Sequence, residues 1–232
     1  MTLAMALRAY DGLVLATDSR ATGGAHQSED TSEKFLQVNR DTGVMTYGLA
    51  VPGYAGISRL VETVKSKREE LTYFRPIAEA AGSVFRAEYK EWLTSQKQQG
   101  HEIPEELKVG FILGGYDSAT NQFSISHWES PEFQERQYDG DLLAAQWHTA
   151  RFLLNKLFYP EISVAQLREL AVFLLVETAI TEPTVGGPLQ LATITLGQGF
   201  QRLHEKDINE ILQRSQKRFC QFRKILLEVF AL

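Results

Sequence analysis

Short apolar runs typical of strands occupy the first fifty residues of the chain. The segments 3–9 and 13–17 are apolar at nearly every position, and Asp11-Gly12 between them is a strong hairpin signal. A second pair of apolar runs covers 35–38 and 44–50. Strands without a polar face are typical of sheets that are covered on both sides. We therefore expect two antiparallel hairpins inside a layered fold.

From Gly56 onward, apolar residues recur three and four positions apart, which is the period of an amphipathic helix. This period predicts helices at 57–64, 76–95, 141–158, 164–181 and 208–229. Further strands are predicted at 109–113 and 122–126 around a turn at 114–117, and at 189–195 and 201–204, while the polar segment 23–32 is predicted to be a loop.

The order of these elements is strands, two helices, strands, two helices, strands and a final helix. Antiparallel hairpins that are apolar on both faces need a layer of helices on each side. The expected fold class is therefore α+β, a four-layer α-β-β-α sandwich in which residues 1–232 form a single domain.

Composition narrows the class of protein. The 24 basic and 29 acidic residues give a net charge of −5, which argues against a dedicated nucleic-acid binder. The single cysteine, Cys220, excludes an intramolecular disulfide and a cysteine-built zinc site. His127 and His148 each flank a tryptophan and are interpreted as core or interface residues rather than catalytic or metal-binding groups. With neither a signal peptide nor an apolar stretch of membrane-spanning length, we expect a cytoplasmic protein with no membrane partner.

Thr2 is the first residue with a candidate chemical role. If Met1 is removed, Thr2 carries both a hydroxyl nucleophile and a free α-amine, whose ordinary pKa of about 8 lets it accept the hydroxyl proton near neutral pH. Many chains begin with Met-Thr without such a role. However, the first hairpin brings Asp18, at the end of its second strand, beside Thr2, and Lys34 opens the third strand. A lysine there would favour the deprotonated hydroxyl and amine, and the carboxylate would keep that lysine charged. Taken separately, Asp18 fits equally well as an acidic residue in a turn, and Lys34 as a solvent-exposed lysine at the edge of a strand.

The segment 11–22, Asp-Gly-Leu-Val-Leu-Ala-Thr-Asp-Ser-Arg-Ala-Thr, resembles the opening of proteasome β-type subunits, which are N-terminal-nucleophile hydrolases. In that family a threonine, an aspartate 16 residues later and a lysine 32 residues later form the catalytic group. Thr2, Asp18 and Lys34 have these two spacings. The resemblance is good over about residues 2–55 and only architectural beyond them.

This resemblance implies further site residues. Gly48 matches the glycine whose backbone N–H forms the oxyanion hole in the family. Ser19 and Arg20 belong to the matching motif and are expected to support the catalytic group. A substrate pocket with small, weakly charged walls is also implied, which would admit an apolar or medium-sized side chain. Its implied lining residues are Ala21, Thr46 and Ala50.

The second half of the chain departs from the family pattern. The family has an aspartate and a serine just before a Gly-Gly pair, which support the N-terminal amine. Here Glu182 stands at the aspartate position and Val185 at the serine position, with Thr184 beside it as a hydroxyl substitute. The family's Ser-Gly segment before the third helix is also missing from 142–148. These departures predict slower turnover or a different substrate.

As a whole, the resemblance implies a proteasome-like threonine hydrolase that cleaves peptide or amide bonds in peptides or unfolded proteins. A hydrolase of this kind is expected to need no metal and no cofactor. It also implies a homo-oligomer, as a ring or a helical assembly that encloses the sites, and an unfoldase partner. Two other classes stay open. One is an N-terminal-nucleophile amidase for small molecules, favoured by the altered second half, and the other is a catalytically silent scaffold or interaction subunit of the same fold.

Overall fold

The computed structural model describes residues 2–23, 27–29, 32–101, 104, 106–145 and 148–229. The strands are β1 (Leu3–Ala9), β2 (Gly12–Thr17), β3 (Ala21–Gly23), β4 (Gln27–Glu29), β5 (Phe35–Asn39), β6 (Thr42–Gly48), β7 (Val109–Asp117), β8 (Gln122–Glu129), β9 (Arg136–Tyr138), β10 (Asp141–Ala145), β11 (Gln190–Thr195) and β12 (Gly199–Arg202). The helices are α1 (Ala50–Ser66), α2 (Phe74–Gln98), α3 (His148–Leu157), α4 (Val164–Thr181) and α5 (Glu205–Val229).

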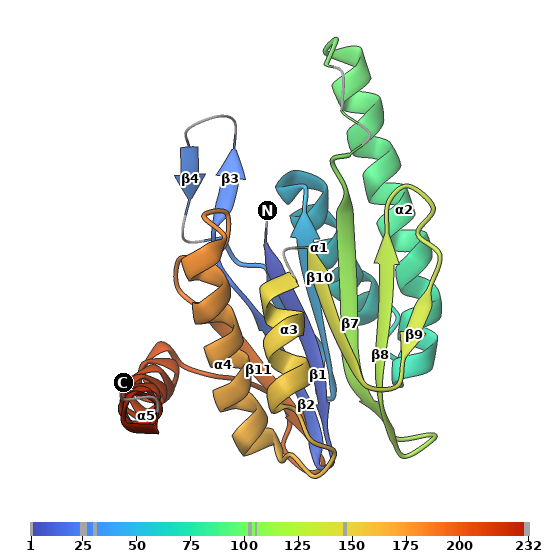
Figure 1. The fold of residues 1–232 in the computed structure, drawn as a ribbon. Helices are drawn as coiled ribbons and strands as arrows, with labels where there is room; N and C mark the ends of the chain where they lie inside the picture. Colours follow the sequence, from blue (N-terminus) through green and yellow to red (C-terminus); the bar gives the residue numbers. More distant parts are fainter. Residues whose placement is uncertain are drawn as a thin grey trace.

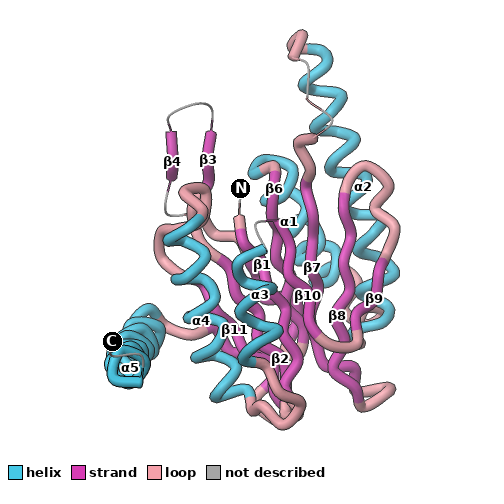
Figure 2. Tube along the Cα trace, viewed as in Figure 1, coloured by secondary structure: helices cyan, strands magenta, loops and turns pink. Residues whose placement is uncertain are grey.

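Two five-stranded antiparallel sheets form the centre of the molecule, and helices cover the outer face of each (Figures 1 and 2). The first sheet has the strand order β10-β1-β2-β11-β12, and the second has the order β5-β6-β7-β8-β9. Helices α3 and α4 lie over the first sheet, while α1 and α2 lie over the second. This arrangement confirms the predicted α+β fold class and its four-layer sandwich.

The apolar character of both strand faces arises from this layering. In β1, Leu3, Met5 and Leu7 pack beneath the helices of the first sheet, whereas Ala4 and Ala6 face the second sheet. Because successive side chains of a strand point to opposite faces, a strand in an inner layer must be apolar at every position. The predicted hairpin of 3–9 and 13–17 is confirmed as β1 and β2, joined by a turn at 10–11.

The helix predicted over 164–181 is confirmed with the same bounds, as α4. Ser163 caps it, since the Ser163 hydroxyl accepts a hydrogen bond from the Gln166 backbone N–H at 3.3 Å. Among the described residues, no helix combines the length and the apolarity that crossing a bilayer requires.

A strand occurs where helical spacing predicted the start of a helix. The predicted helix over 141–158 is wrong for its first residues, because Asp141–Ala145 forms β10 and α3 begins only at His148. Leu142 faces the layer between the sheets and Leu143 faces the outer helices, which is the two-residue period of a strand. The difference arises because β10 pairs with β1 and completes the edge of the first sheet.

One predicted loop and one predicted turn also differ from the structure. The segment 23–32, predicted to be a loop, contributes to a short hairpin in which β3 pairs with β4. Strand β7 continues through the predicted turn at 114–117, and the chain reverses at 118–121 instead. Gly114 and Gly115 allow close packing there: a Cβ atom on Gly114 would lie 2.8 Å from Leu15 and one on Gly115 would lie 2.6 Å from Phe74.

A polar pair, Tyr47 and His127, lies buried between the two sheets. The Tyr47 hydroxyl and His127 Nε2 are 2.8 Å apart, and the two rings are stacked. Burial lowers the pKa of His127 to about 4, and the positive charge of Arg136 contributes to the same effect. Burial also raises the pKa of Tyr47. Both side chains are therefore neutral at pH 7, as expected for polar groups in an apolar layer.

Acid is expected to destabilise the fold through His127. The imidazole takes up a proton near pH 6.5 in the unfolded chain but only near pH 4 in the folded one. Stability that is fully present above pH 6.5 is therefore lost as the pH falls toward 4, by up to about 3 kcal/mol. Urea unfolding at several pH values should show a smaller loss for His127→Gln than for the natural chain. Identical pH dependence in both proteins would contradict this origin.

Candidate active site

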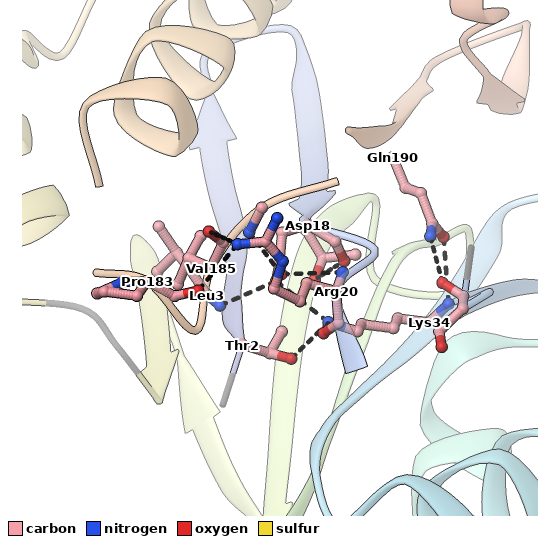
Figure 3. A network of polar contacts seen from close by, with 11 residues as sticks. Thr2, Leu3, Asp18, Arg20, Lys34, Pro183, Val185 and Gln190 are labelled. Atoms are coloured by element: carbon pink, nitrogen blue, oxygen red, sulfur yellow. Dashed lines mark hydrogen bonds and ion pairs between the residues drawn. The ribbon is translucent and has the colours of Figure 1, made fainter. Parts of the chain in front are cut away.

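Thr2, Asp18 and Lys34 meet at one end of the sandwich, as Figure 3 shows. Thr2 directly precedes β1 and Asp18 directly follows β2, and the antiparallel register that pairs Ala4 with Thr17 brings these two strand ends together. Lys34 directly precedes β5 in the second sheet, so its side chain bridges the two sheets. The three residues that the sequence placed in one group are in contact in the structure.

The Lys34 side chain is the centre of this contact. Its ammonium, Nζ, donates hydrogen bonds to Thr2 Oγ1 at 2.6 Å, to Asp18 Oδ1 at 3.2 Å and to the backbone carbonyl of Arg20 at 2.5 Å. Lys34 and Thr2 are each 3% exposed, and Asp18 is fully buried. A cation held within hydrogen-bond distance of a buried hydroxyl stabilises the deprotonated form of that hydroxyl.

Backbone N–H groups fix the Asp18 carboxylate. Oδ1 accepts a hydrogen bond from the Leu3 N–H at 3.1 Å, and Oδ2 accepts from Gly186 at 3.1 Å and from Arg20 at 3.2 Å. Burial raises the pKa of Asp18 above its ordinary value, while the charge of Lys34 and the hydrogen bonds from Gly186 and Leu3 oppose that effect. The carboxylate thus joins the start of β1 to the loop after α4.

Ser19 and Arg20 attach this loop to the site. The Gly186 carbonyl accepts hydrogen bonds from the backbone N–H groups of Ser19 at 3.2 Å and Arg20 at 2.9 Å. The Arg20 guanidinium donates to the Pro183 carbonyl at 2.8 Å. A Cβ atom on Gly186 would lie 2.7 Å from the Arg20 guanidinium carbon, so the guanidinium packs directly against this loop.

The resemblance assigned Glu182 and Thr184 to the support of the nucleophile. In the described part of the chain, no hydrogen bond joins either side chain to Thr2, and the Thr184 hydroxyl is buried without a hydrogen-bond partner. Val185 is buried in the apolar cluster beneath α3 and α4. The loop reaches the site through the backbone of Gly186, which the sequence motif did not indicate.

A further contact that the sequence did not reveal comes from Gln190, at the start of β11. Its side-chain oxygen accepts a hydrogen bond from the Lys34 backbone N–H at 3.1 Å, and its side-chain nitrogen donates to the Ser32 carbonyl at 2.6 Å. Gln190 is 8% exposed. This buried amide holds the segment that carries Lys34 against the first sheet (Figure 3).

Gly48 ends β6 on the wall of the same cavity as Thr2. Its φ of +85° lies in the left-handed region, and a Cβ atom there would lie 1.9 Å from the Lys108 carbonyl oxygen. Glycine is therefore required by the backbone at this position. The absence of a side chain also leaves the peptide group of Gly48 open to a ligand in the cavity.

The cavity beside Thr2 has a volume of about 780 Å³. All three residues that the resemblance assigned to the substrate pocket lie on its wall: Ala21, Thr46 and Ala50. The lining also includes Tyr47, His127 and Tyr138, which the sequence did not indicate. Within the described ranges, no group of three or more His, Cys, Asp or Glu side chains is placed to hold a metal ion.

Two known proteins with sequences similar to this chain are named as proteasome β subunits. No family model matches the chain. The chain is 23% identical over 219 residues to "Proteasome subunit beta 2" of Thermomonospora curvata, which covers 91% of this chain and 75% of that protein. It is 25% identical over 222 residues to "Proteasome subunit beta 1" of Streptomyces avermitilis, covering 90% of this chain and 74% of that protein. The similarity to proteasome β subunits therefore extends well beyond residues 2–55 and covers about nine-tenths of the chain.

Proposed function

We propose that this protein is a threonine-type hydrolase that cleaves peptide bonds with Thr2 as its nucleophile. The observation that carries the proposal is the 2.6 Å hydrogen bond from Lys34 Nζ to Thr2 Oγ1, in a buried position at the edge of a cavity. A buried hydroxyl that contacts a buried, paired cation is the arrangement that an activated hydroxyl nucleophile needs.

The first half of the reaction forms an ester. After Met1 is removed, the α-amine of Thr2 takes the proton from Oγ1, directly or through a water, as Oγ1 attacks the carbonyl carbon of the substrate. Lys34 lowers the pKa of both groups by its charge, and Asp18 keeps Lys34 charged and oriented. The tetrahedral intermediate then expels the leaving amine, which receives the proton from the Thr2 ammonium.

The second half hydrolyses the ester. A water attacks the acyl carbon while the α-amine takes its proton, and the proton returns to Oγ1 as the ester bond breaks. In both halves the backbone N–H of Gly48 stabilises the oxyanion. The small side chains of Ala21, Thr46 and Ala50 leave room for an apolar or medium-sized side chain of the acyl group. Ser19, Arg20 and the 182–187 loop support Asp18 through the backbone of Gly186.

Replacing the nucleophile tests the proposal. Thr2→Ala should lower peptide hydrolysis by at least about a thousandfold, because the bond-forming oxygen is lost. A fluorogenic peptide panel measures the rate, and intact mass spectrometry after an epoxyketone or β-lactone should show one adduct that the variant lacks. Thr120→Ala, an exposed threonine in the turn after β7, is the matched control and should keep full activity.

Each other result of this experiment has a distinct meaning. Unchanged peptide hydrolysis by Thr2→Ala would overturn the mechanism. Hydrolysis of small amides but not of peptides would indicate an amidase of the same superfamily. The absence of both hydrolysis and an adduct would indicate a catalytically silent subunit.

The proposed role of Lys34 can be tested separately, through the rate and its pH dependence. Lys34→Met should lower kcat by about a hundredfold or more, and the ascending limb of the pH profile should move to higher pH because the Thr2 amine regains a higher pKa. Lys34→Met leaves the Asp18 carboxylate buried without its cation, which destabilises the fold. The double variant Lys34→Met/Asp18→Asn removes both charges, so the same kinetic measurement is made on it if the single variant does not fold. Lys65→Met, on the exposed end of α1, is the control. A lower rate with an unmoved pH profile would contradict this role.

We also propose that the chain forms a homo-oligomer that encloses its sites, with unfolded chains delivered by a separate unfoldase. Supporting this proposal, α3 and α4 expose large apolar side chains: Phe152 is 63% exposed and Ile180 is 73% exposed. These helices lie side by side, joined by a hydrogen bond between the Thr149 and Thr181 hydroxyls. Exposed apolar residues on one helix pair are typical of a surface that is covered in an assembly.

Light scattering measures the oligomer directly. The natural chain should elute at a multiple of 26.2 kDa, and Phe152→Glu/Ile180→Glu should shift it to smaller species because buried charges disfavour the interface. Leu196→Glu, an exposed apolar residue in the β11–β12 turn, is the matched control and should not change the mass. A natural chain of single-chain mass would overturn the oligomer.

A further inference from the structure

The cavity beside Thr2 has two walls on opposite faces of β6. Thr46 points toward α1, since its hydroxyl donates to the Gly110 carbonyl at 3.1 Å and a Cβ atom on Gly53 would lie 2.5 Å from that hydroxyl. Tyr47, the next residue, points into the layer between the sheets. Because side chains alternate along a strand, Thr46 contributes to an outer wall and Tyr47 to an inner wall, and Gly48 ends the strand directly after them.

The inner wall is built mainly from rings. Tyr47 stacks with His127 at a centroid distance of 5.9 Å, and His127 meets the Tyr138 ring edge to face at 6.2 Å. Gly110 makes this possible, because a Cβ atom there would lie 2.1 Å from the Tyr47 ring. Leu142 and Ala144 of β10 line the same part of the cavity.

Charged side chains also line the cavity, and two of them lie near the inner wall. Arg136 is exposed and Glu129 is half-buried, and they carry opposite charges. Deeper in, Tyr47 and His127 are neutral at pH 7 because burial disfavours their charged forms. The same burial disfavours a charged ligand group at this wall.

We propose that the inner wall binds an uncharged aromatic side chain of the substrate, at the residue that follows the scissile bond. The inference rests on the proposed function and names a specificity of the same site. If the acyl side chain occupies the outer wall and the scissile carbonyl faces Gly48, the leaving half of the peptide continues toward Tyr47. An aromatic ring matches three neighbouring rings, which pack in stacked and edge-to-face arrangements.

Matched peptides test the specificity. Internally quenched peptides with one acyl half should carry Phe, Ala, Lys or Glu after the scissile bond, and mass spectrometry of the products should establish the cleaved bond. The kcat/KM for Phe should exceed that for Ala by about tenfold or more, with Lys and Glu below Ala. Tyr47→Ala should reduce the Phe-to-Ala ratio to below about threefold, because the stacked wall is lost.

Two further variants keep the test decisive. Tyr138→Ala, on the edge strand β9, should also reduce the ratio and serves if Tyr47→Ala does not fold. Tyr116→Ala is the matched control, since Tyr116 lies at the far end of β7 and its hydroxyl donates to Asn121. The control should keep the full preference for Phe.

The failure of this inference differs from the failure of the proposed function. Hydrolysis that depends on Thr2 but shows no preference among the four peptides would overturn the inference alone. If no peptide is cleaved, the proposed function fails. A binding measurement then decides whether the inner wall accepts an uncharged aromatic side chain. In that case the Thr2→Ala variant should bind the dipeptide amide Phe-Gly with shifts in the His127 ring signals by NMR and should not bind Lys-Gly. The absence of a shift with Phe-Gly would overturn the inference that the inner wall binds an aromatic side chain as well.

Discussion

One buried cation organises this end of the molecule. Lys34 brings its ammonium out of water and needs partners that compensate for the lost hydration, and it finds them in the Asp18 carboxylate, the Thr2 hydroxyl and the Arg20 carbonyl. Thr2 and Asp18 lie at the ends of strands β1 and β2 of the first sheet, whereas Lys34 directly precedes β5 of the second. The ion pair thus ties the two sheets together at the point where the proposed nucleophile lies.

The supporting contacts extend this arrangement into the second half of the chain. Asp18 is held by the Gly186 N–H, and the Lys34 segment is held by the Gln190 side chain. Gly186 lies in the stretch that joins α4 to β11, and Gln190 is the first residue of β11 at the end of that stretch. Since that stretch uses a backbone group and an amide, its side chains at 182 and 184 are free to depart from the family pattern without breaking the observed network.

The layered fold explains why the cavity has two different walls. Strand β6 lies between the outer helices and the inner layer, so Thr46 and Tyr47 serve opposite faces although they are adjacent in sequence. Glycine at 48 and at 110 provides the room that these walls need: one leaves the peptide group open and the other lets Tyr47 lie across β7. The outer wall carries the small side chains of Ala21, Thr46 and Ala50, while the inner wall is aromatic.

Much of this architecture follows from local patterns. The two-faced apolar runs predicted inner strands, the helical period predicted α4, and the spacing of Thr2, Asp18 and Lys34 within their motif predicted the group that the structure brings together. These signals are readable because strand register and hairpin geometry relate residues that are near in sequence. Strand β10 and the Gly186 and Gln190 contacts depend on pairing across more than a hundred residues. The Tyr47–His127 wall depends on contact between two strands of one sheet, β6 and β8, 80 residues apart. No short window of sequence carries that information, so the tertiary structure alone decided them.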